Sequence, residues 1–331
     1  MPTVSVIIPT YNLADYICEA IDSVLNQTFK DFEIIVVDDG SKDNTREVLK
    51  KYVNKISYFF KDNGGIASAR NFGIKRSKGD YIALLDADDI WMPDKLEQQI
   101  NIYNIDPEIA AVFTDAETFD NNGIIRNSLR PLSAPTDTKS LKYKIFEAGL
   151  NDGSVIKGDF YPDLINSNLF AASTALIKKS CLEKIGSFDE NLVIDDDYDL
   201  WIRISKSFPV SFYSMVLMRY RIREDSASGT RGMRPYLYRK RDAYMFENHL
   251  KNCKSNFYKN LIKSRVLISY KIAAWGYLNV YDLSEARRLS IRCLRYNIFQ
   301  IKPFIYILVS FWPKSFIRFV KNLKKPCQKS A

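Results

Sequence analysis

The first hundred residues alternate between short apolar runs and segments in which apolar residues recur every three or four positions. Apolar β-branched runs are typical of buried strands, and the longer period is typical of amphipathic helices. The pattern predicts strands at 4–9, 32–39, 56–60 and 81–86. Between them it predicts helices over 12–27, around 48–53 and up to about residue 75. Strands that are apolar on both faces and separated by helices indicate an α/β fold with a mostly parallel, Rossmann-like central sheet flanked by helices.

Polar residues collect where three of these strands end. The strand ends read PTYN (9–12), DDGS (38–41) and DADD (86–89). The carboxyl ends of parallel strands meet at one edge of a sheet, and ligands of open α/β sheets bind outside that edge. We therefore expect a ligand site there.

After Trp91 the pattern is less regular. It predicts a helix at 93–104, a strand at 109–114, a hairpin around 120–123, strands at 168–178 and 210–222, and no clear element over 126–165. Beyond about residue 230 the apolar spacing becomes helical and the charge becomes basic. We expect two parts, residues 1–230 and a helical basic extension at 231–331.

The net charge of +9 is unevenly distributed. Residues 236–331 hold 20 Lys and Arg against 4 Asp and Glu, whereas residues 1–235 hold 28 against 35. An acidic part suits metal binding, and a basic part suits an anionic surface. The five cysteines are scattered without CxxC spacing, which argues against a disulfide framework or a zinc cluster and favours the cytoplasm.

Neither a signal peptide nor a membrane-spanning helix is expected. The N-terminus has no basic segment before its first apolar run. The apolar stretch 304–312 lies between Lys302 and Lys314 and is shorter than the roughly 20 residues that a spanning helix needs. His249 is the only histidine, so carboxylates must supply any acid–base chemistry.

The acidic turn after the fourth strand carries Asp86, Asp88 and Asp89. Carboxylates this close repel one another in a folded site unless a cation compensates them. Carboxylate oxygens suit Mg²⁺ or Mn²⁺, ions that complete their coordination with water and phosphate oxygens. A metal site that holds a diphosphate is one interpretation, and a solvated acidic turn is the other.

Two further segments contribute polar groups to the expected edge. Asp39 is suited to accept a hydrogen bond from a base or a ribose, although neighbouring polar residues also suit the cap of the next helix. Arg70 stands among the small residues Ala67, Ala69 and Gly73, which would let its helix lie close to the sheet. Arg70 then either contacts a base or phosphate or forms a structural ion pair.

A late segment, VIDDDYDLWIRIS (193–205), places Asp197 on the same helical stripe as Leu200, Trp201 and Ile204. A carboxylate that faces inward is costly unless it caps the helix or has a chemical role. Asp197 is a candidate general base, and helix capping by Asp196 or Asp197 is the alternative.

Taken together, PTYN, VVDDGSKDNT, NGGIASARNFG, LDADD and GSFDENL…DDDYDLWIR, in this order, resemble the inverting glycosyltransferases of family two, of the bacterial polysaccharide type, over about residues 1–230. The resemblance implies a GT-A fold and a nucleoside-diphosphate sugar donor with uridine as the base. It assigns nucleotide binding to ten positions: Pro9, Thr10, Tyr11, Asn12, Asp39, Asn63, Arg70, Asp86, Ala87 and Asp88. It also implies that Asp86 and Asp88 form a DxD motif for Mn²⁺ or Mg²⁺.

The chain departs from the family pattern at two places. Where the family often has Glu-Asp, this chain has Asp196-Asp197, so either aspartate is a candidate base. Many relatives have a histidine after the last strand, where this chain reads Ile222-Arg223-Glu224. The implied reaction is a direct displacement in which an aspartate deprotonates an acceptor hydroxyl and the metal offsets charge on the leaving diphosphate.

The basic extension interleaves cations with bulky apolar residues over 285–325, a pattern that suits an anionic membrane surface. A helical lid with a solvated basic face is the alternative, and nucleic acid is disfavoured. We expect an enzyme at the cytoplasmic face of the inner membrane that acts on a glycan or lipid-linked acceptor. Its rivals are a sugar-nucleotide pyrophosphorylase and an inactive membrane-docked scaffold.

Overall fold

The computed structural model describes residues 1–128, 143–146, 153–192, 195–223, 234–313 and 315. The chain divides into two compact units, residues 1–226 and 227–331. The expected boundary near residue 230 lies outside the described residues. Each unit is therefore considered by itself.

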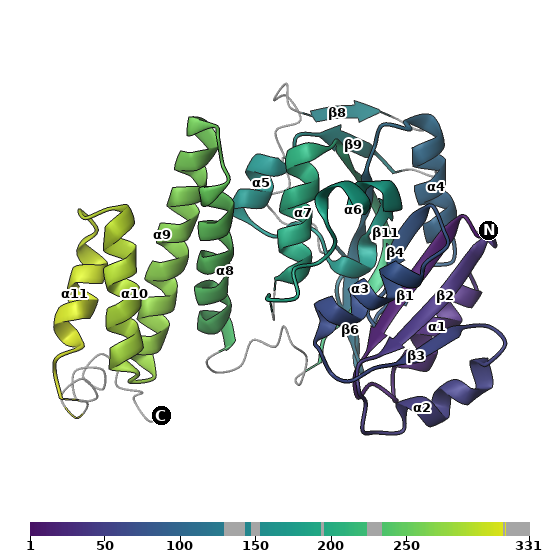
Figure 1. Ribbon diagram of the computed structural model, residues 1–331, viewed down its shortest axis with the longest axis horizontal. Coiled ribbons are helices and arrows are strands. Elements are labelled where there is room, and N and C mark those ends of the chain that lie inside the picture. The colour runs from purple at the N-terminus through teal and green to yellow at the C-terminus, as the bar shows by residue number, and fades with distance from the viewer. Residues whose placement is uncertain (129–142, 147–152, 193–194, 224–233, 314, 316–331) are drawn as a thin grey trace, which may run out of the picture. The chain divides into compact units, whose positions relative to one another are not determined.

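An 11-stranded sheet forms the centre of the first unit (Figure 1). In spatial order its main strands are β3 (Ser57–Phe60), β2 (Phe32–Asp38), β1 (Val4–Thr10), β4 (Tyr81–Leu84), β10 (Leu176–Lys178), β6 (Ala111–Asp120), β11 (Val210–Arg221), β9 (Val155–Gly158) and β8 (Tyr143–Phe146). Two short strands pair outside this order, β5 (Ile90–Trp91) with β11 and β7 (Gly123–Arg126) with β6. The strands β3, β2, β1 and β4 are parallel, as predicted. By contrast, β10 runs antiparallel to both of its neighbours.

The helices of this unit are α1 (Ile17–Leu25), α2 (Thr45–Val48), α3 (Ile66–Arg76), α4 (Lys95–Ile105), α5 (Tyr161–Asn166), α6 (Lys179–Ile185) and α7 (Asp196–Ser207). Two 3₁₀ turns, η1 (Leu49–Tyr52) and η2 (Ala172–Thr174), accompany them. The helix expected over 12–27 is shorter than predicted, because it begins only at Ile17.

Alternating residues of β1 serve the two faces of the sheet. Val6 and Ile8 belong to the same buried cluster as Ile21 of α1. The intervening Ile7 faces α3, since a Cβ added to Gly73 would lie 2.6 Å from Cγ2 of Ile7. The prediction that small residues let this helix lie close to the sheet is therefore confirmed.

The three polar strand ends do meet at one edge. Thr10 and Asp38 are cross-strand partners at the ends of β1 and β2. The Asp39 N–H donates to the Thr10 carbonyl at 2.9 Å, and the Leu85 N–H donates to the Ile7 carbonyl at 3.1 Å. The register of the parallel strands thus brings PTYN, DDGS and DADD together.

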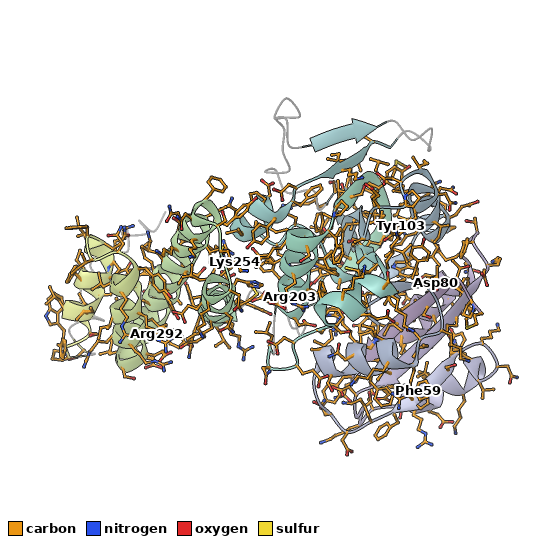
Figure 2. All side chains as sticks on the ribbon, turned by 45° about the horizontal axis from the view of Figure 1, so that its top comes forward. Phe59, Asp80, Tyr103, Arg203, Lys254 and Arg292 are labelled. Atoms are coloured by element: carbon orange, nitrogen blue, oxygen red, sulfur yellow. The ribbon has the colours of Figure 1, made fainter. Side chains whose placement is uncertain are left out.

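The strand predicted over 168–178 is wrong for most of its length. Only Leu176–Lys178 is a strand, held in part by Tyr103 (labelled in Figure 2), whose hydroxyl donates to the Leu176 carbonyl at 2.6 Å. The preceding turn, η2, does not continue the strand because both the carbonyl and the hydroxyl of Ser173 bond to groups outside the sheet ladder. Its carbonyl accepts from Trp91 Nε1 at 2.9 Å, and its hydroxyl bonds to the acidic turn. These contacts compete with the sheet ladder.

The second unit is helical, as expected, and consists of α8 (Arg234–Lys251), α9 (Asn256–Asn279), α10 (Leu283–Tyr296) and α11 (Ile301–Val309) in its described part. Gly276 of α9 packs against Tyr236 of α8, leaving no room for a Cβ. Arg292 of α10 (labelled in Figure 2) donates to the Tyr270 hydroxyl of α9 at 3.0 Å. Within the residues that the structure describes, no helix has both the length and the apolar character to cross a bilayer.

Candidate active site

The acidic turn separates its three carboxylates into one buried group and two accessible groups. Ser173 holds the turn, because its Oγ accepts from the Asp86 N–H at 3.0 Å and donates to Asp89 Oδ2 at 2.6 Å. The Arg221 N–H donates to Asp89 Oδ1 at 3.1 Å. Burial and the charges of Asp88 and Asp86 raise the pKa of Asp89 well above its usual range. Asp89 is therefore a structural group, and Asp86 and Asp88, with side chains 26% and 16% exposed, remain for a ligand.

Arg70 joins this turn to the start of α7. Its side chain is 2% exposed and comes from the helix that packs closely on β1. One terminal nitrogen donates to Asp86 Oδ1 at 2.7 Å and the other to Asp196 Oδ2 at 2.8 Å. Burial alone would lower the pKa of Arg70, but the charges of Asp86 and Asp196 raise it. Arg70 is a permanent cation that fixes two carboxylates side by side.

Arg70 was predicted to contact the nucleotide or to form an ion pair, and the structure shows the ion pair. Its guanidinium also lies over the ring of Phe188, 5.2 Å from the centroid. Asn71, the next residue, accepts from the Phe188 N–H at 3.0 Å and donates to the Phe188 carbonyl at 2.9 Å. The NGGIASARNFG and GSFDENL segments are thus bound to each other.

The two candidate bases have different surroundings. Asp196 is buried and bound to Arg70. Asp197 is half-buried, and its Oδ1 accepts from the Tyr198 N–H at 2.6 Å. Burial and the Asp196 charge, opposed by Arg70, raise the pKa of Asp197 to about 7. A pKa near the working pH suits a general base, so Asp197 remains the candidate for that role.

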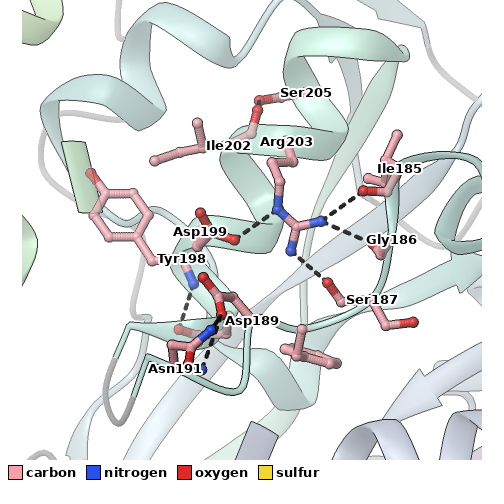
Figure 3. A network of polar contacts seen from close by, with 12 residues as sticks. Ile185, Gly186, Ser187, Asp189, Asn191, Tyr198, Asp199, Ile202, Arg203 and Ser205 are labelled. Atoms are coloured by element: carbon pink, nitrogen blue, oxygen red, sulfur yellow. Dashed lines mark hydrogen bonds and ion pairs between the residues drawn. The ribbon is translucent and has the colours of Figure 1, made fainter. Parts of the chain in front are cut away.

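A polar network anchors α7 to the segment that precedes it (Figure 3). The Arg203 Nε donates to Asp199 Oδ2 at 2.7 Å within the helix. Its terminal nitrogens donate to the carbonyls of Gly186 at 2.9 Å and Ser187 at 2.6 Å (Figure 3). This contact holds α7, the helix that begins with both candidate bases, against the GSFDENL segment.

Asp88 pairs with Arg223, which stands where many members of the family have a histidine. Arg223, just beyond β11, donates from Nε to Asp88 Oδ2 at 2.9 Å. Burial and the Asp86 charge raise the pKa of Asp88, and Arg223 opposes that rise. A cation therefore lies at the position where the sequence motif predicted a metal ion.

At the other end of the edge, the PTYN residues form a turn that is fastened to the next loop. Pro9 and the buried Thr10 end β1, and the exposed Tyr11 follows them. Asn12 has a positive φ of 54° and accepts from the Lys42 N–H through Oδ1 at 2.7 Å. The hydroxyl of Thr10 is buried without a hydrogen-bond partner among the described atoms.

Asp39 is buried and already has three donors. Lys61 Nζ lies 2.6 Å from Oδ1, and the N–H groups of Gly64 and Gly65 donate at 3.0 and 2.7 Å. Asn63 is exposed in the same turn. Asp39 therefore shapes the entry to α3, and a carboxylate retains acceptor capacity for a nucleotide beyond these bonds.

Two residues of the site, Ser173 and Lys61, were not identified from the sequence, and neither was the contact of Arg223 with Asp88. Ser173 lies in a run that reads as a strand, and Lys61 lies at a strand end without a motif. Only Arg223 carried a signal, since it stands where a histidine is usual in the family. A search for cations near each acidic strand end would have found Lys61 as well.

The site fits a divalent ion that is only partly coordinated by protein. Among the described residues, no group of three His, Cys, Asp or Glu side chains is arranged to hold a metal. Asp86 and Asp88 supply two carboxylates, one on each side of the buried Ala87. Mg²⁺ and Mn²⁺ are commonly held by one or two carboxylates plus phosphate oxygens. The donor set therefore suits an ion that arrives with a diphosphate.

Comparison with known proteins identifies the class. The chain matches the family model "Glycosyl transferase family 2" over residues 5–156. An uncharacterized glycosyltransferase of Rickettsia typhi is 41% identical over 230 residues, covering 69% of this chain and 67% of that protein.

Two solved structures share the fold. One is S. aureus TarS in complex with UDP-GlcNAc, with a TM-score of 0.52 at 18% identity, covering 94% of this chain and 79% of that chain. The other is the mannosyltransferase PcManGT from Pyrobaculum calidifontis in complex with GDP-Man and Mn²⁺, with a TM-score of 0.53 at 19% identity, covering 98% and 87%.

The mixed sheet flanked by helices is the GT-A fold of glycosyltransferases, which confirms the predicted fold class. The chain belongs to glycosyltransferase family 2 and is a glycosyltransferase enzyme. The alternative that the protein is a sugar-nucleotide pyrophosphorylase is therefore not supported.

Proposed function

We propose that this enzyme transfers a sugar from a uridine-diphosphate sugar to a hydroxyl of a glycan or lipid-linked acceptor, with inversion at the anomeric carbon. One observation carries the proposal. Arg70 binds Asp86 and Asp196 at the same time, so the acidic turn, where we place the diphosphate, is joined to the start of α7, where the candidate base Asp197 lies. A displacement reaction needs this proximity, because leaving group and base act on opposite sides of one carbon.

Donor binding is assigned to the edge of the parallel strands. In the proposal, Asp39 and the exposed Asn63 contact the base or ribose, and the PTYN turn lies beside them. Thr10, with its buried and unpartnered hydroxyl, offers a further hydrogen bond to the donor. The support is geometric, since the strand register brings these residues to the same edge as Asp86 and Asp88.

A divalent ion, Mn²⁺ or Mg²⁺, is proposed at Asp86 and Asp88, where it would offset the charge that develops on the departing diphosphate. Arg223 pairs with Asp88 in the present structure, so it competes with the ion or remains as a second cation near the phosphates. Asp86 and Asp196 raise the pKa of Arg70. Arg70 therefore stays charged during the reaction and keeps its hydrogen bond to Asp86.

Asp197 is proposed to take the proton from the acceptor hydroxyl. As the hydroxyl oxygen bonds to the anomeric carbon, the bond from that carbon to the diphosphate oxygen breaks, and the configuration inverts. Asp196 stays paired with Arg70 and positions the first turn of α7. No covalent enzyme intermediate is needed.

The proposed setting is polysaccharide synthesis at the cytoplasmic face of the inner membrane. The basic and apolar surface of the second unit supports a peripheral contact with an anionic membrane. Nucleic acid is not a proposed partner, because bulky aliphatic residues are mixed with the cations.

To test the reaction, the protein is incubated with Mn²⁺ and a panel of uridine-, guanosine- and thymidine-diphosphate sugars, and slow release of free nucleoside diphosphate is measured. We expect release from a uridine-diphosphate sugar that is lost in Asp88→Asn and Asp197→Asn. The matched control is Glu47→Gln, which removes an exposed carboxylate outside the site. Silence across the panel, or full activity of Asp88→Asn, would contradict the proposal.

A further inference from the structure

The last described helix of the second unit exposes the stripe of residues that a helix normally buries. Ile301, Phe304, Ile305 and Leu308 of α11 are spaced i, i+3, i+4 and i+7, so they share one helical face. All four are exposed, Ile301 at 74% and Leu308 at 65%. Of the whole helix, Pro303 is its single buried residue. Phe299, two residues before the helix, is 89% exposed.

This face is held in place by the opposite side of the helix. The ring of Tyr306 in α11 packs against Trp275 of α9, with ring centroids 5.5 Å apart. Arg287 of α10 donates to Ser310 Oγ at 3.0 Å and to the Ser310 carbonyl at 3.1 Å. The same guanidinium lies 3.7 Å from the ring centroid of Phe311. The helix is therefore docked on α9 and α10, and its apolar stripe points away from them.

The part of the sequence that carries the stripe has charges of a single sign. From residue 286 to the end of the sequence there are 11 Lys and Arg and no Asp or Glu. Arg295 near the end of α10 and Lys302 in the first turn of α11 are both exposed. Of the cations and aromatic residues that the sequence pattern indicated, those at 314 and 316–325 lie outside the described residues. The described part alone still presents cations next to apolar side chains.

We propose that the exposed apolar side chains of the segment 298–312, termed here the α11 face, insert into the surface of an anionic phospholipid bilayer, so that the helix lies in the plane of the membrane. Nine helical residues span about 14 Å at 1.5 Å each, roughly half the hydrocarbon thickness, so the helix cannot cross. Apolar insertion combined with attraction to anionic headgroups is the way such helices bind membranes. This inference deepens the membrane location proposed above, and it names the surface and the lipid chemistry.

The test measures sedimentation of the full chain with vesicles, which requires no sugar transfer. Vesicles of phosphatidylcholine alone are compared with vesicles containing about 30% phosphatidylglycerol, at low and high salt. We expect binding to the anionic vesicles and its weakening by salt. Phe299→Ser with Leu308→Ser, and separately Arg295→Glu with Lys302→Glu, should each weaken binding by about tenfold or more.

Matched controls come from the first unit. Val53→Ser removes an apolar side chain that is 73% exposed, and Lys55→Glu reverses an exposed charge. Both should bind as the wild type does. Asp197→Asn should also bind normally, which separates a failure of docking from a failure of catalysis. Circular dichroism checks that every variant is folded.

Two results would overturn the inference. One is wild-type protein that stays in the supernatant with anionic vesicles. The other is binding that the Phe299→Ser/Leu308→Ser variant leaves unchanged. If that variant instead converts a dimer into a monomer while neither form binds vesicles, the α11 face belongs to a second copy of the chain and the lipid assignment is wrong.

Discussion

Replacing Arg70 with methionine tests the ionic bridge on which the geometry of the site depends. Arg70, 2% exposed, is paired with Asp86 and Asp196, the latter with a side chain 6% exposed. Methionine fills much of the same volume but leaves Asp196 charged and buried. Removing one partner of a buried ion pair costs about 3–5 kcal/mol, mainly because the remaining charge is uncompensated. We expect a loss of this size in the free energy of unfolding of the first unit.

A second substitution separates lost charge compensation from lost packing. In the Arg70→Met background, Asp196→Asn removes the uncompensated charge and should recover about 1–3 kcal/mol. In the wild-type background, Asp196→Asn should be destabilising, because Arg70 then loses one of its two partners. The sign of the Asp196→Asn effect therefore reverses between the two backgrounds.

Urea denaturation followed by tryptophan fluorescence measures these values. Trp91 and Trp201 are buried in the first unit, whereas Trp275 and Trp312 belong to the second. With Trp275→Phe and Trp312→Phe in every protein, the signal reports the first unit alone. If Arg70→Met costs less than about 1 kcal/mol, or if Asp196→Asn has the same sign in both backgrounds, the bridge does not hold the site together.

Three further outcomes follow from the site and its supports. Because the pKa of Asp197 is raised to about 7, its carboxyl is protonated below that pH, so kcat/KM should fall about tenfold per unit as the pH drops below 7. A bound cation would shift this fall in kcat/KM to lower pH. A kcat/KM that does not change between pH 5 and 8 would contradict the assignment of Asp197 as the general base. Arg223→Gln should strengthen Mn²⁺ binding several-fold in calorimetry without nucleotide, because it removes the cation paired with Asp88, and weaker binding would contradict the competition. Gly73→Ala places a Cβ 2.6 Å from Ile7, so thermal denaturation should show a loss of about 1–3 kcal/mol, and an unchanged melting temperature would contradict close helix packing.

The parallel half of the sheet was predictable because each strand is specified locally. Strands β1, β2 and β4 are continuous apolar runs, and their register follows from βαβ connections. Once these strands were identified, the meeting of Thr10, Asp38 and the acidic turn at one edge followed from topology. The stripe of α7 was also visible as a helical period.

Contacts between distant segments were not predictable in the same way. The pattern over 168–178 favours a strand, but Ser173 bonds to the acidic turn 87 positions earlier and bends the chain into η2. Likewise, the periodic stripe placed Asp197 inward, whereas Asp196 is the more buried aspartate because Arg70 lies opposite it. The periodicity of a helix shows which residues share a face. It does not show which distant residue a charged side chain will contact, such as Arg70, which binds Asp196 from 126 positions earlier.

The most direct test of the account is calorimetry of uridine diphosphate with and without saturating Mn²⁺. If Asp86 and Asp88 hold an ion that in turn holds the diphosphate, the affinity should rise at least tenfold with Mn²⁺, and Asp88→Asn should abolish that gain. Equal affinity in the presence and absence of the ion would contradict the central claim.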